Sequence, residues 1–354
     1  MDRENSPDIS IQPEVSALPE ISILIVSYNT RELTLAAIDS VARQTHTPHE
    51  IIVVDNRSID GSKDAIAAHP AAPRLIALDD NIGFARANNL AARHARADTL
   101  LLLNPDTVVL DHAIDRLMEF ARQNPSAQIW GGRTLFADGS LNPSSCWQRI
   151  SLWSTFCRTT GLAAIFPNSP LFNAEAIGGW ARDRERNVDI VSGCFFMIPK
   201  SLWNKLGGFD PAFYMYGEEA DLCLRAHRQG ARPAITPGAT IIHLGGASER
   251  TRAAKMIKLL CAKITLINRH LPAWQRPLAR LLMRLWPLTR QVALGAISLL
   301  SGADKHKQSA AEWRDVWRRR AEWQNGYRSD RDRLPVGAGS SLASLPPSPK
   351  PNIQ

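Results

Sequence analysis

The sequence lacks several features that would place it in a common protein class. Its five cysteines form no Cys-x-x-Cys pair, which excludes a zinc ribbon or a disulfide framework and favours a reducing compartment. It has no run of about 18 apolar residues, so we expect no bilayer-spanning helix. Residues 1–20 are polar and contain three prolines, so we expect no secretory signal there. Neither a Walker motif nor Gly-x-Gly-x-x-Gly follows the first apolar run, which argues against P-loop NTPases and NAD-dependent dehydrogenases.

The charges are present in ordinary number but are unevenly spread. The 354 residues are 44% hydrophobic and 21% charged, which is typical of a globular protein and excludes wholesale disorder. Residues 250–333 hold 19 Lys/Arg and 6 Asp/Glu, a net charge of +13. The remainder holds 23 Lys/Arg and 28 Asp/Glu, a net of −5. A mildly acidic body is therefore followed by a basic segment that favours an anionic partner.

The first 125 residues alternate between short apolar runs and amphipathic helical patterns. The predicted strands are 21–27, 50–55, 74–78 and 99–103, and the predicted helices are 30–44, 62–69, 83–96 and 111–123. Such alternation predicts an α/β fold with a mostly parallel central sheet and helices on both faces. Polar residues follow each strand at its carboxyl end, which is the edge where open α/β sheets bind ligands.

The second half is more mixed. We predict a hairpin turn near 137–140, an irregular segment over 142–187, strands over 188–198 and 239–243, and helices over 199–206, 218–229 and 251–323. The chain then divides into a flexible arm (1–20), an α/β domain (21–250), a basic helical segment (251–334) and a disordered tail (335–354).

Four groups of residues are candidates for chemistry. Asp55 ends a predicted strand, where its carboxylate could accept the N–H of a uracil or thymine base; the alternative is a turn or helix-capping aspartate. Asp106, in Asn104-Pro105-Asp106, could hold a divalent cation, although this tripeptide is also a common turn. His243 ends another strand before two glycines and could reach a metal, or it could be structural.

The fourth group is the acidic start of a helix, Glu218-Glu219-Ala220-Asp221. Carboxylates at a helix start are favoured by the helix dipole alone. Crowded carboxylates also raise one another's pKa, which can make one of them a general base. An aromatic loop (208–217) leads into this helix and could form one wall of a sugar pocket.

Taken together, these segments resemble the family 2 glycosyltransferases, over roughly residues 20–250. The resemblance rests on Ser-Ile-Leu-Ile-Val-Ser-Tyr-Asn (22–29), Val-Val-Asp-Asn-Arg-Ser-Ile-Asp-Gly-Ser (53–62), Asn-Ile-Gly-Phe-Ala-Arg-Ala-Asn-Asn (81–89), Leu-Leu-Asn-Pro-Asp-Thr (102–107), Val-Ser-Gly-Cys-Phe-Phe-Met-Ile (191–198) and Gly-Gly-Phe-Asp-Pro-Ala-Phe…Gly-Glu-Glu-Ala-Asp-Leu-Cys-Leu-Arg (207–225). The Asn-Pro-Asp form and the Asn-Ile-Gly-Phe segment are most similar to the rhamnosyltransferase branch.

The resemblance implies a GT-A fold and inverting transfer of a sugar from a nucleotide-diphosphate donor, with a divalent cation (Mg²⁺ or Mn²⁺) as cofactor. Asp106 matches the last aspartate of the family's Asp-x-Asp metal motif, His243 matches a metal-binding histidine, and Glu219 matches the catalytic base. The donor and acceptor would be bound by Ser27, Asn29, Asp55, Asn81, Gly83, Asn104, Asp106, Glu218 and Asp221.

Two positions depart from the family pattern. Asn104 stands where the motif has its first aspartate, so the metal site has one charge fewer. Glu219 stands where aspartate is usual, which keeps the neighbouring Glu218 as a second candidate for the base. The expected donor is dTDP-L-rhamnose and the expected acceptor is a glycan or a lipid-linked sugar. Two alternatives remain, namely another UDP- or dTDP-sugar as donor, and a non-catalytic protein that binds sugar nucleotides or glycans.

The basic helical segment has its own expected partner. In residues 278–290, Arg280 and Arg284 share one face of the predicted helix, and leucines and a tryptophan occupy its other faces. A cationic helix of this kind favours an anionic membrane surface, contacted through residues 251–323, rather than nucleic acid. The enzyme would then be cytoplasmic and peripheral on the inner face of the membrane. The alternative is a helical tail that only packs on the domain.

Overall fold

The computed structural model describes residues 18–245, 251–301 and 303–327. Most of the expected flexible arm and all of the expected disordered tail lie outside these residues. The strands are β1 (Ile21–Ser27), β2 (His49–Asp55), β3 (Arg74–Ala77), β4 (Thr99–Leu103), β5 (Thr107–Val109), β6 (Trp130–Leu135), β7 (Leu141–Asn142), β8 (Cys146–Trp147), β9 (Arg186–Asn187), β10 (Ile190–Val191), β11 (Phe195–Pro199) and β12 (Ala234–His243).

Helices alternate with these strands and then form the C-terminal part of the fold. They are α1 (Arg31–Gln44), α2 (Ser62–Ala67), α3 (Phe84–His94), α4 (Ala113–Gln123), α5 (Leu152–Thr160), α6 (Leu162–Ile165), α7 (Lys200–Leu206), α8 (Glu218–His227), α9 (Arg252–His270), α10 (Arg276–Ser301) and α11 (Asp304–Arg318), with short 3₁₀ turns at Pro143–Ser145, Ala273–Gln275 and Arg320–Glu322. Among the described residues, none of these helices is both long and apolar enough to cross a bilayer.

One central sheet organises the molecule. Its strand order is β3-β2-β1-β4-β11-β6-β12-β5, with β7 and β9 attached at its side. The first four strands in this order are parallel, whereas β11 runs antiparallel to both of its neighbours and β5 runs antiparallel to β12. All seven residues of β1 are buried because the strand lies in the middle of a sheet that is covered on both sides.

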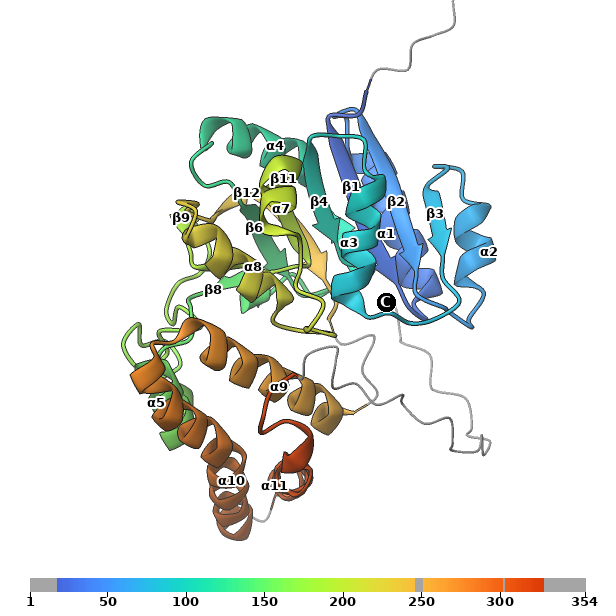
Figure 1. Cartoon of the computed structure of the whole chain (residues 1–354). Helices are drawn as coiled ribbons and strands as arrows, with labels where there is room; N and C mark the ends of the chain where they lie inside the picture. The colour runs from blue at the N-terminus through green and yellow to red at the C-terminus, as the bar shows by residue number, and fades with distance from the viewer. Residues whose placement is uncertain (1–17, 246–250, 302, 328–354) are drawn as a thin grey trace, which may run out of the picture.

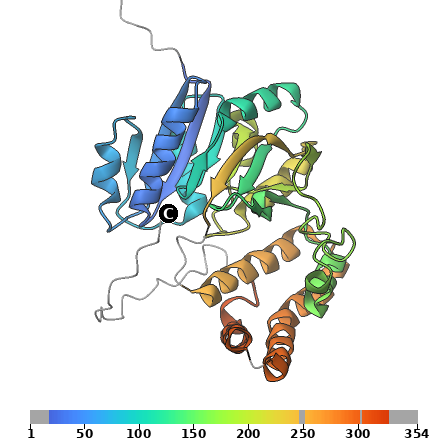
Figure 2. The same cartoon turned by 180° about the vertical axis from the view of Figure 1, so that it is seen from behind.

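The two faces of the sheet carry separate hydrophobic cores. Alternate strand residues such as Leu24 and Ile52 pack with α3, α7 and α8 on one face (Figure 1). Their neighbours Ile25 and Val53 pack with α1, α2 and α4 on the other face, seen in the view from behind (Figure 2). The predicted doubly covered, mostly parallel sheet is therefore confirmed.

The C-terminal helices gather on one side of this sheet. Helices α9, α10 and α11 lie together with α5 below the sheet in Figure 1, on the side of α8 and β8, and α9 packs against α8. Buried side chains of α9 and α10, including Ile264 and Met283, belong to the same hydrophobic cluster as one sheet face. Helix α9 therefore faces the carboxyl edge of the sheet, where the candidate site residues are expected, and α10 and α11 pack against α9.

Three element predictions were wrong in detail. The segment 142–187 is not irregular throughout, since it forms α5 and α6, and Ser151 and Ser154 cap the start of α5 reciprocally. The single strand expected over 188–198 is two strands, because the chain turns at Ser192, whose N–H donates to Ser145 O. Strand β12 begins at Ala234 rather than at residue 239, and a register shift at Pro237–Gly238 interrupts its pairing with β6.

Candidate active site

A cavity of about 550 Å³ opens at the carboxyl edge of β1, β2 and β4. Its lining comes from the loops after these strands, the aromatic loop before α8, the end of β12, and α9. The lining includes Tyr28, Thr30, Asn56, Asn81, Gly83, Asn104, Asp106, Tyr214, Tyr216, His243, Lys255 and Lys258. Because parallel strands end at one edge and α9 faces that edge, residues as far apart in the sequence as Val26 and Lys258 meet in this cavity. We refer to it as the first cavity.

Asp55 and Asn29 hold the loops beside the first cavity. Asp55 ends β2 and is 2% exposed; its Oδ2 accepts from Ser58 N at 3.0 Å. Its Oδ1 is buried and has no hydrogen-bond partner within the described part of the chain. Asn29 Oδ1 accepts from Ile59 N at 2.8 Å, so the loops after β1 and β2 are fastened to each other. Neither Asp55 nor Asn29 is among the residues that line the first cavity, whereas their neighbours Tyr28 and Asn56 are. The unpartnered Asp55 oxygen is therefore an acceptor beside the cavity rather than in its wall.

Ser27 lies behind this surface rather than on it. Its hydroxyl is fully buried, 3.0 Å from Thr34 Oγ1 and 3.4 Å from Thr30 Oγ1. It is not among the residues that line the first cavity. Ser27 therefore supports the loop after β1 from inside, and Thr30 is the hydroxyl of this group that reaches the cavity wall.

Asn81 and Gly83 position an aromatic side chain. Asn81 Oδ1 accepts from Gly83 N at 3.0 Å and from Tyr214 Oη at 3.1 Å. Gly83 has a φ of 83°, and a Cβ at this position would lie 2.8 Å from Tyr214 O and from its ring. Only glycine permits this approach, so the segment before α3 and the aromatic loop before α8 form one wall.

Asn104, Asp106 and His243 meet at the centre of the site. His243 Nε2 lies 3.3 Å from both Asp106 Oδ1 and Asn104 Nδ2, and Asp106 Oδ2 accepts from Gly245 N at 3.0 Å. Strand β5 pairs with β12, which brings the turn after β4 next to the end of β12. The three residues are candidates from separate sequence segments, and the short β5 that brings them together was not among the predicted elements.

The charges of this group are coupled. Burial opposes ionisation of Asp106, but the hydrogen bond and charge of His243 outweigh it and lower the Asp106 pKa. Burial also disfavours a charged His243, yet the Cys194 and Asp106 side chains raise its pKa to about 10. The metal-free site thus favours an imidazolium beside a carboxylate.

The residues present fit a divalent cation. Asp106 offers a carboxylate, and His243 offers an imidazole. Asn104 Oδ1 and His243 Nδ1 are both buried without a hydrogen-bond partner among the described residues. Oxygen and imidazole ligands of this kind suit Mg²⁺ or Mn²⁺, although a single carboxylate gives the site less charge than two would.

A second cavity of about 490 Å³ adjoins the first. The two share Phe84, Asn104, Tyr216, His243 and Lys255 as lining residues. The second cavity is also lined by Glu218 and Glu219 of α8, by the turn at Ser192–Cys194, and by residues of α9. The acidic pair therefore lines the second cavity, and Asn104 and His243, which line both cavities, connect it to the Asn104–Asp106–His243 group. Each of the two spaces could take a substrate.

The two glutamates have different surroundings. Glu218 is 4% exposed, and its Oε2 has no hydrogen-bond partner in the described residues. Burial and the charge of Glu219 raise the Glu218 pKa well above its usual value. Glu219 is partly buried, and its Oε2 accepts from Gly217 N at 3.1 Å. Burial raises its pKa as well, in part opposed by backbone hydrogen bonds.

Asp221 has a different role from its two neighbours. Its carboxylate is 2% exposed and is held by Arg225 Nε at 2.7 Å and His270 Nε2 at 2.8 Å. Burial raises its pKa, but the His270 hydrogen bond and the Arg225 charge outweigh burial and lower it. Asp221 lines neither cavity and instead fastens α8 to α9.

The second cavity also contains a charged group that sequence reasoning missed. Glu175 pairs with Lys263 of α9 and with Arg158 of α5, whose Nη2 lies 3.2 Å from Glu175 Oε2. No local signal marks these three residues, because they come from separate parts of the chain. Only the packing of α5 and α9 over the sheet edge brings them together.

Comparison with known proteins gives the following matches. The family model described as "Glycosyl transferase family 2" matches residues 22–180. The N-acetylglucosaminyl-diphospho-decaprenol L-rhamnosyltransferase of Mycobacterium tuberculosis is 26% identical over 291 residues, covering 77% of this chain and 91% of the relative. The rhamnosyltransferase WbbL of Escherichia coli is 26% identical over 253 residues, covering 67% of this chain and 88% of WbbL.

Two further matches extend this set. The O-antigen biosynthesis protein RfbC of Myxococcus xanthus is 29% identical over 247 residues, which are 68% of this chain and 18% of that much longer protein. Among solved structures, the mannosyltransferase PcManGT from Pyrobaculum calidifontis, in complex with GDP-Man and Mn²⁺, aligns with a TM-score of 0.54 at 15% identity, covering 89% of this chain and 90% of that chain. The predicted GT-A fold and the family resemblance are confirmed.

Proposed function

Because the chain is a glycosyltransferase with a family 2 domain, we propose that it transfers L-rhamnose from dTDP-L-rhamnose to a hydroxyl of a glycan or lipid-linked acceptor, with inversion at the anomeric carbon. The two rhamnosyltransferases among its relatives support the choice of sugar. The observation that carries the proposal is the pair of adjoining cavities. Asn104 and His243 line both of them, Asp106 lines the first, and the acidic pair lines the second.

The first cavity would hold the donor. Asp55 Oδ1 would accept the N3–H of the thymine base, which gives this buried oxygen the partner it otherwise lacks. Asn29 fixes the loop that follows Asp55 by accepting from Ile59 N, and Ser27 supports the loop after β1 from within. Asn81 and Gly83 would act through the Tyr214 wall.

Asp106 and His243 would hold a divalent cation, Mg²⁺ or Mn²⁺, with the Asn104 amide oxygen beside them. When bound, the cation supplies positive charge beside the diphosphate of the donor. Lys255 and Lys258 of α9 line the same cavity and add cationic groups on its other side.

The second cavity would hold the acceptor, with Glu219 as the general base. The acceptor hydroxyl gives its proton to the Glu219 carboxylate while its oxygen attacks the anomeric carbon. The bond from that carbon to the diphosphate oxygen breaks, and the nucleoside diphosphate leaves with its electron pair. One displacement inverts the carbon, so the reaction needs one base and no nucleophilic side chain.

We place the base at Glu219 rather than Glu218. Glu219 is the more accessible of the two, and its Oε2 is oriented by Gly217 N. Glu218 is almost fully buried, and burial together with the charge of Glu219 raises its pKa, which favours the protonated and therefore inactive form of a base. In its protonated form, Glu218 then lines the second cavity without adding a second negative charge beside Glu219.

We also propose that the enzyme binds the inner face of the cell membrane through residues 251–323. Helix α10 exposes an apolar stripe on one face, comprising Leu278 (49% exposed), Leu281 (51%), Val292 (63%) and Leu299 (89%). Arg280 and Arg284 lie between this stripe and the buried face of α10, where Arg284 Nη2 donates to Gln324 O at 3.3 Å. The electrostatic attraction to an anionic membrane would come from the net charge of +13 over residues 250–333. A lipid-linked acceptor would reach the second cavity from that surface. We expect no nucleic-acid partner.

Vesicle binding tests the membrane proposal. The double variant Leu281→Glu/Val292→Glu should lose most pelleting with anionic vesicles, since it places two charges in the stripe. Leu18→Glu is a matched control, because Leu18 is 77% exposed and precedes β1 at the other end of the sheet. Equal pelleting of the two variants would contradict the proposal.

A donor panel tests the proposed transfer. dTDP-L-rhamnose, other dTDP-sugars and UDP-sugars are each incubated with a polyprenyl-diphospho-N-acetylglucosamine acceptor, with Mg²⁺, with Mn²⁺ and with chelator. We expect metal-dependent turnover that is fastest with dTDP-L-rhamnose. Faster turnover of another donor would favour the alternative sugar. Binding without turnover of any donor would favour a non-catalytic nucleotide-sugar or glycan-binding protein.

A further inference from the structure

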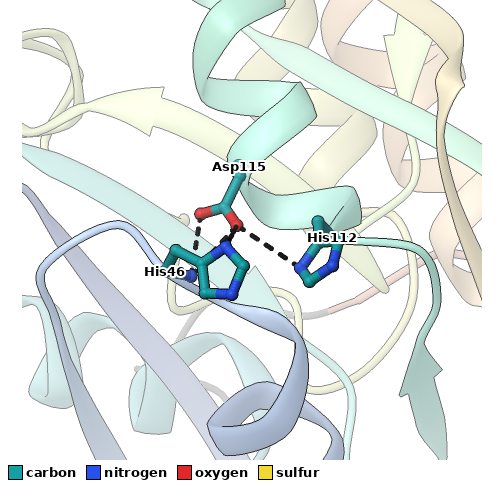
Figure 3. A group of neighbouring side chains, drawn as sticks. All are labelled: His46, His112 and Asp115. Atoms are coloured by element: carbon teal, nitrogen blue, oxygen red, sulfur yellow. Dashed lines mark hydrogen bonds and ion pairs between the residues drawn. The ribbon is translucent and has the colours of Figure 1, made fainter.

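Three side chains of metal-binding type meet on the surface, away from both cavities. His46 lies in the turn between α1 and β2, His112 precedes α4, and Asp115 is in the first turn of α4 (Figure 3). Helix α1 starts beside the first cavity at Thr30 and ends at Gln44, just before His46. A helix of this length spans about 20 Å, so the cluster is well separated from the proposed sugar-transfer site.

Both imidazoles converge on one carboxylate oxygen. The Nδ1 atoms of His46 and His112 lie 3.7 and 3.9 Å from Asp115 Oδ2 (Figure 3). These distances are too long for hydrogen bonds. They are close to the separation of about 3.3 Å between ligand atoms in a tetrahedral zinc site with bonds near 2.0 Å. The candidate ligand atoms of the three residues all lie within 4.8 Å of one another.

The carboxylate is held in place by its own hydrogen bonds. Asp115 Oδ1 accepts from Thr47 Oγ1 at 2.6 Å and from Thr47 N at 2.8 Å, and Oδ2 accepts from His46 N at 3.0 Å. Such bonds fix a carboxylate ligand before a metal arrives. They also join the turn after α1 to the start of α4, across 68 positions in the sequence.

Joining the α1–β2 turn to α4 explains the hydrogen bonds of Asp115, but it does not explain the positions of the two imidazole rings. The turn needs only the Asp115 contacts with residues 46 and 47, whereas the two rings are also stacked, with centroids 4.4 Å apart. Asp111 and His112 adopt left-handed backbone conformations, with φ of 43° and 56°, and this strained geometry places the His112 ring beside His46. His112 Nδ1 also lies 3.1 Å from Gln44 O, a contact that a metal would replace.

We propose that His46, His112 and Asp115 form a binding site for a divalent transition metal of the zinc class, with water completing the coordination. Two imidazoles and one carboxylate favour Zn²⁺, Ni²⁺ or Cu²⁺ over Mg²⁺, which prefers oxygen ligands. The His46 side chain is 78% exposed, so the site is open to ions from solvent. A bound ion would clamp the α1–β2 turn to α4.

Zinc titration tests this site in the full-length chain. The Asp106→Asn/His243→Ala variant serves as the background, because it removes the ligands proposed for the sugar-transfer site. We expect this protein to bind one Zn²⁺ by calorimetry and to gain thermal stability with it. Adding His46→Ala should weaken the binding by about tenfold or more, and so should His112→Ala. Millimolar Mg²⁺ should not compete.

His306→Ala is the matched control, because it removes a partly exposed histidine of α11 outside the cluster. It should leave zinc affinity unchanged. The His46 ring is largely exposed, so circular dichroism and the melting temperature in chelator should show a folded His46→Ala protein. No measurable zinc binding in the background protein, or unchanged affinity in both histidine variants, would overturn the proposal.

Discussion

Replacing Glu175 by glutamine should destabilise the enzyme more than any single change of a surface charge. The Glu175 side chain is 9% exposed and pairs with Lys263 and Arg158, whose side chains are 19% and 24% exposed. Glutamine keeps the shape but removes the negative charge, which leaves two largely buried cations facing each other. Breaking such a buried group by removing one partner costs about 3–5 kcal/mol.

The pKa of Glu175 gives a second measure of the same effect. Burial raises this pKa, but the charges and hydrogen bonds of Arg158 and Lys263 outweigh burial and lower it from 4.5 to about 2. A shift of this size corresponds to about 3 kcal/mol of stability at neutral pH. Because the folded-state pKa is depressed, this stability is fully present above pH 4.5 and is lost as pH falls toward 2.

Thermal and urea unfolding at pH 7 measure the predicted loss. For a protein of this size, about 3 kcal/mol lowers the melting temperature by roughly 4 °C. Glu119→Gln is the matched control, since Glu119 forms an exposed pair with Arg122 and should cost at most about 1 kcal/mol. Unfolding free energies of Glu175→Gln and wild type that agree within 1 kcal/mol would refute the reasoning.

Three further predictions concern the site. Asp55→Asn should weaken binding of the donor nucleotide by about tenfold, because an amide accepts more weakly from the base N–H; equal affinity by calorimetry would remove Asp55 from the donor site. Asp221→Asn should lower stability by about 3 kcal/mol and leave donor affinity unchanged, since this carboxylate joins α8 to α9; a loss of affinity without destabilisation would contradict that role. Wild-type kcat should rise with pH through a midpoint above 4.5, because the Glu219 pKa is raised and a base must be deprotonated; a profile that is flat from pH 4.5 to 8 would argue against it.

Much of the fold could be predicted because the parallel half has strong local signals. The first strand, 21–27, is one uninterrupted apolar run, and the structure has it at the same bounds as β1. The division of 188–198 into two strands could not be predicted, since both halves are apolar and the turn at Ser192 depends on a contact with Ser145. Helix α5 was missed for a similar reason, because its aromatic and polar residues give a weak pattern.

Some residues of the candidate site could likewise be placed from the sequence, and others could not. Asp55 and Asp106 follow strands, so their presence at one sheet edge follows from topology. Asp221 could not be separated from Glu218 and Glu219 by sequence, because its partner His270 is 49 residues away and becomes adjacent only when α9 packs on α8. The roles of these residues in binding and catalysis stay predictions.

Steady-state kinetics of two glutamine variants test the central proposal most directly. With dTDP-L-rhamnose and a lipid-linked acceptor, Glu219→Gln should reduce kcat by about 100-fold or more, the usual contribution of a general base, with donor Kd nearly unchanged. Glu218→Gln should reduce kcat less, because adjacent helix residues point about 100° apart and only one of them can face the acceptor. The opposite order of effects would move the base to Glu218, and full activity in both variants would contradict a mechanism that uses this helix start.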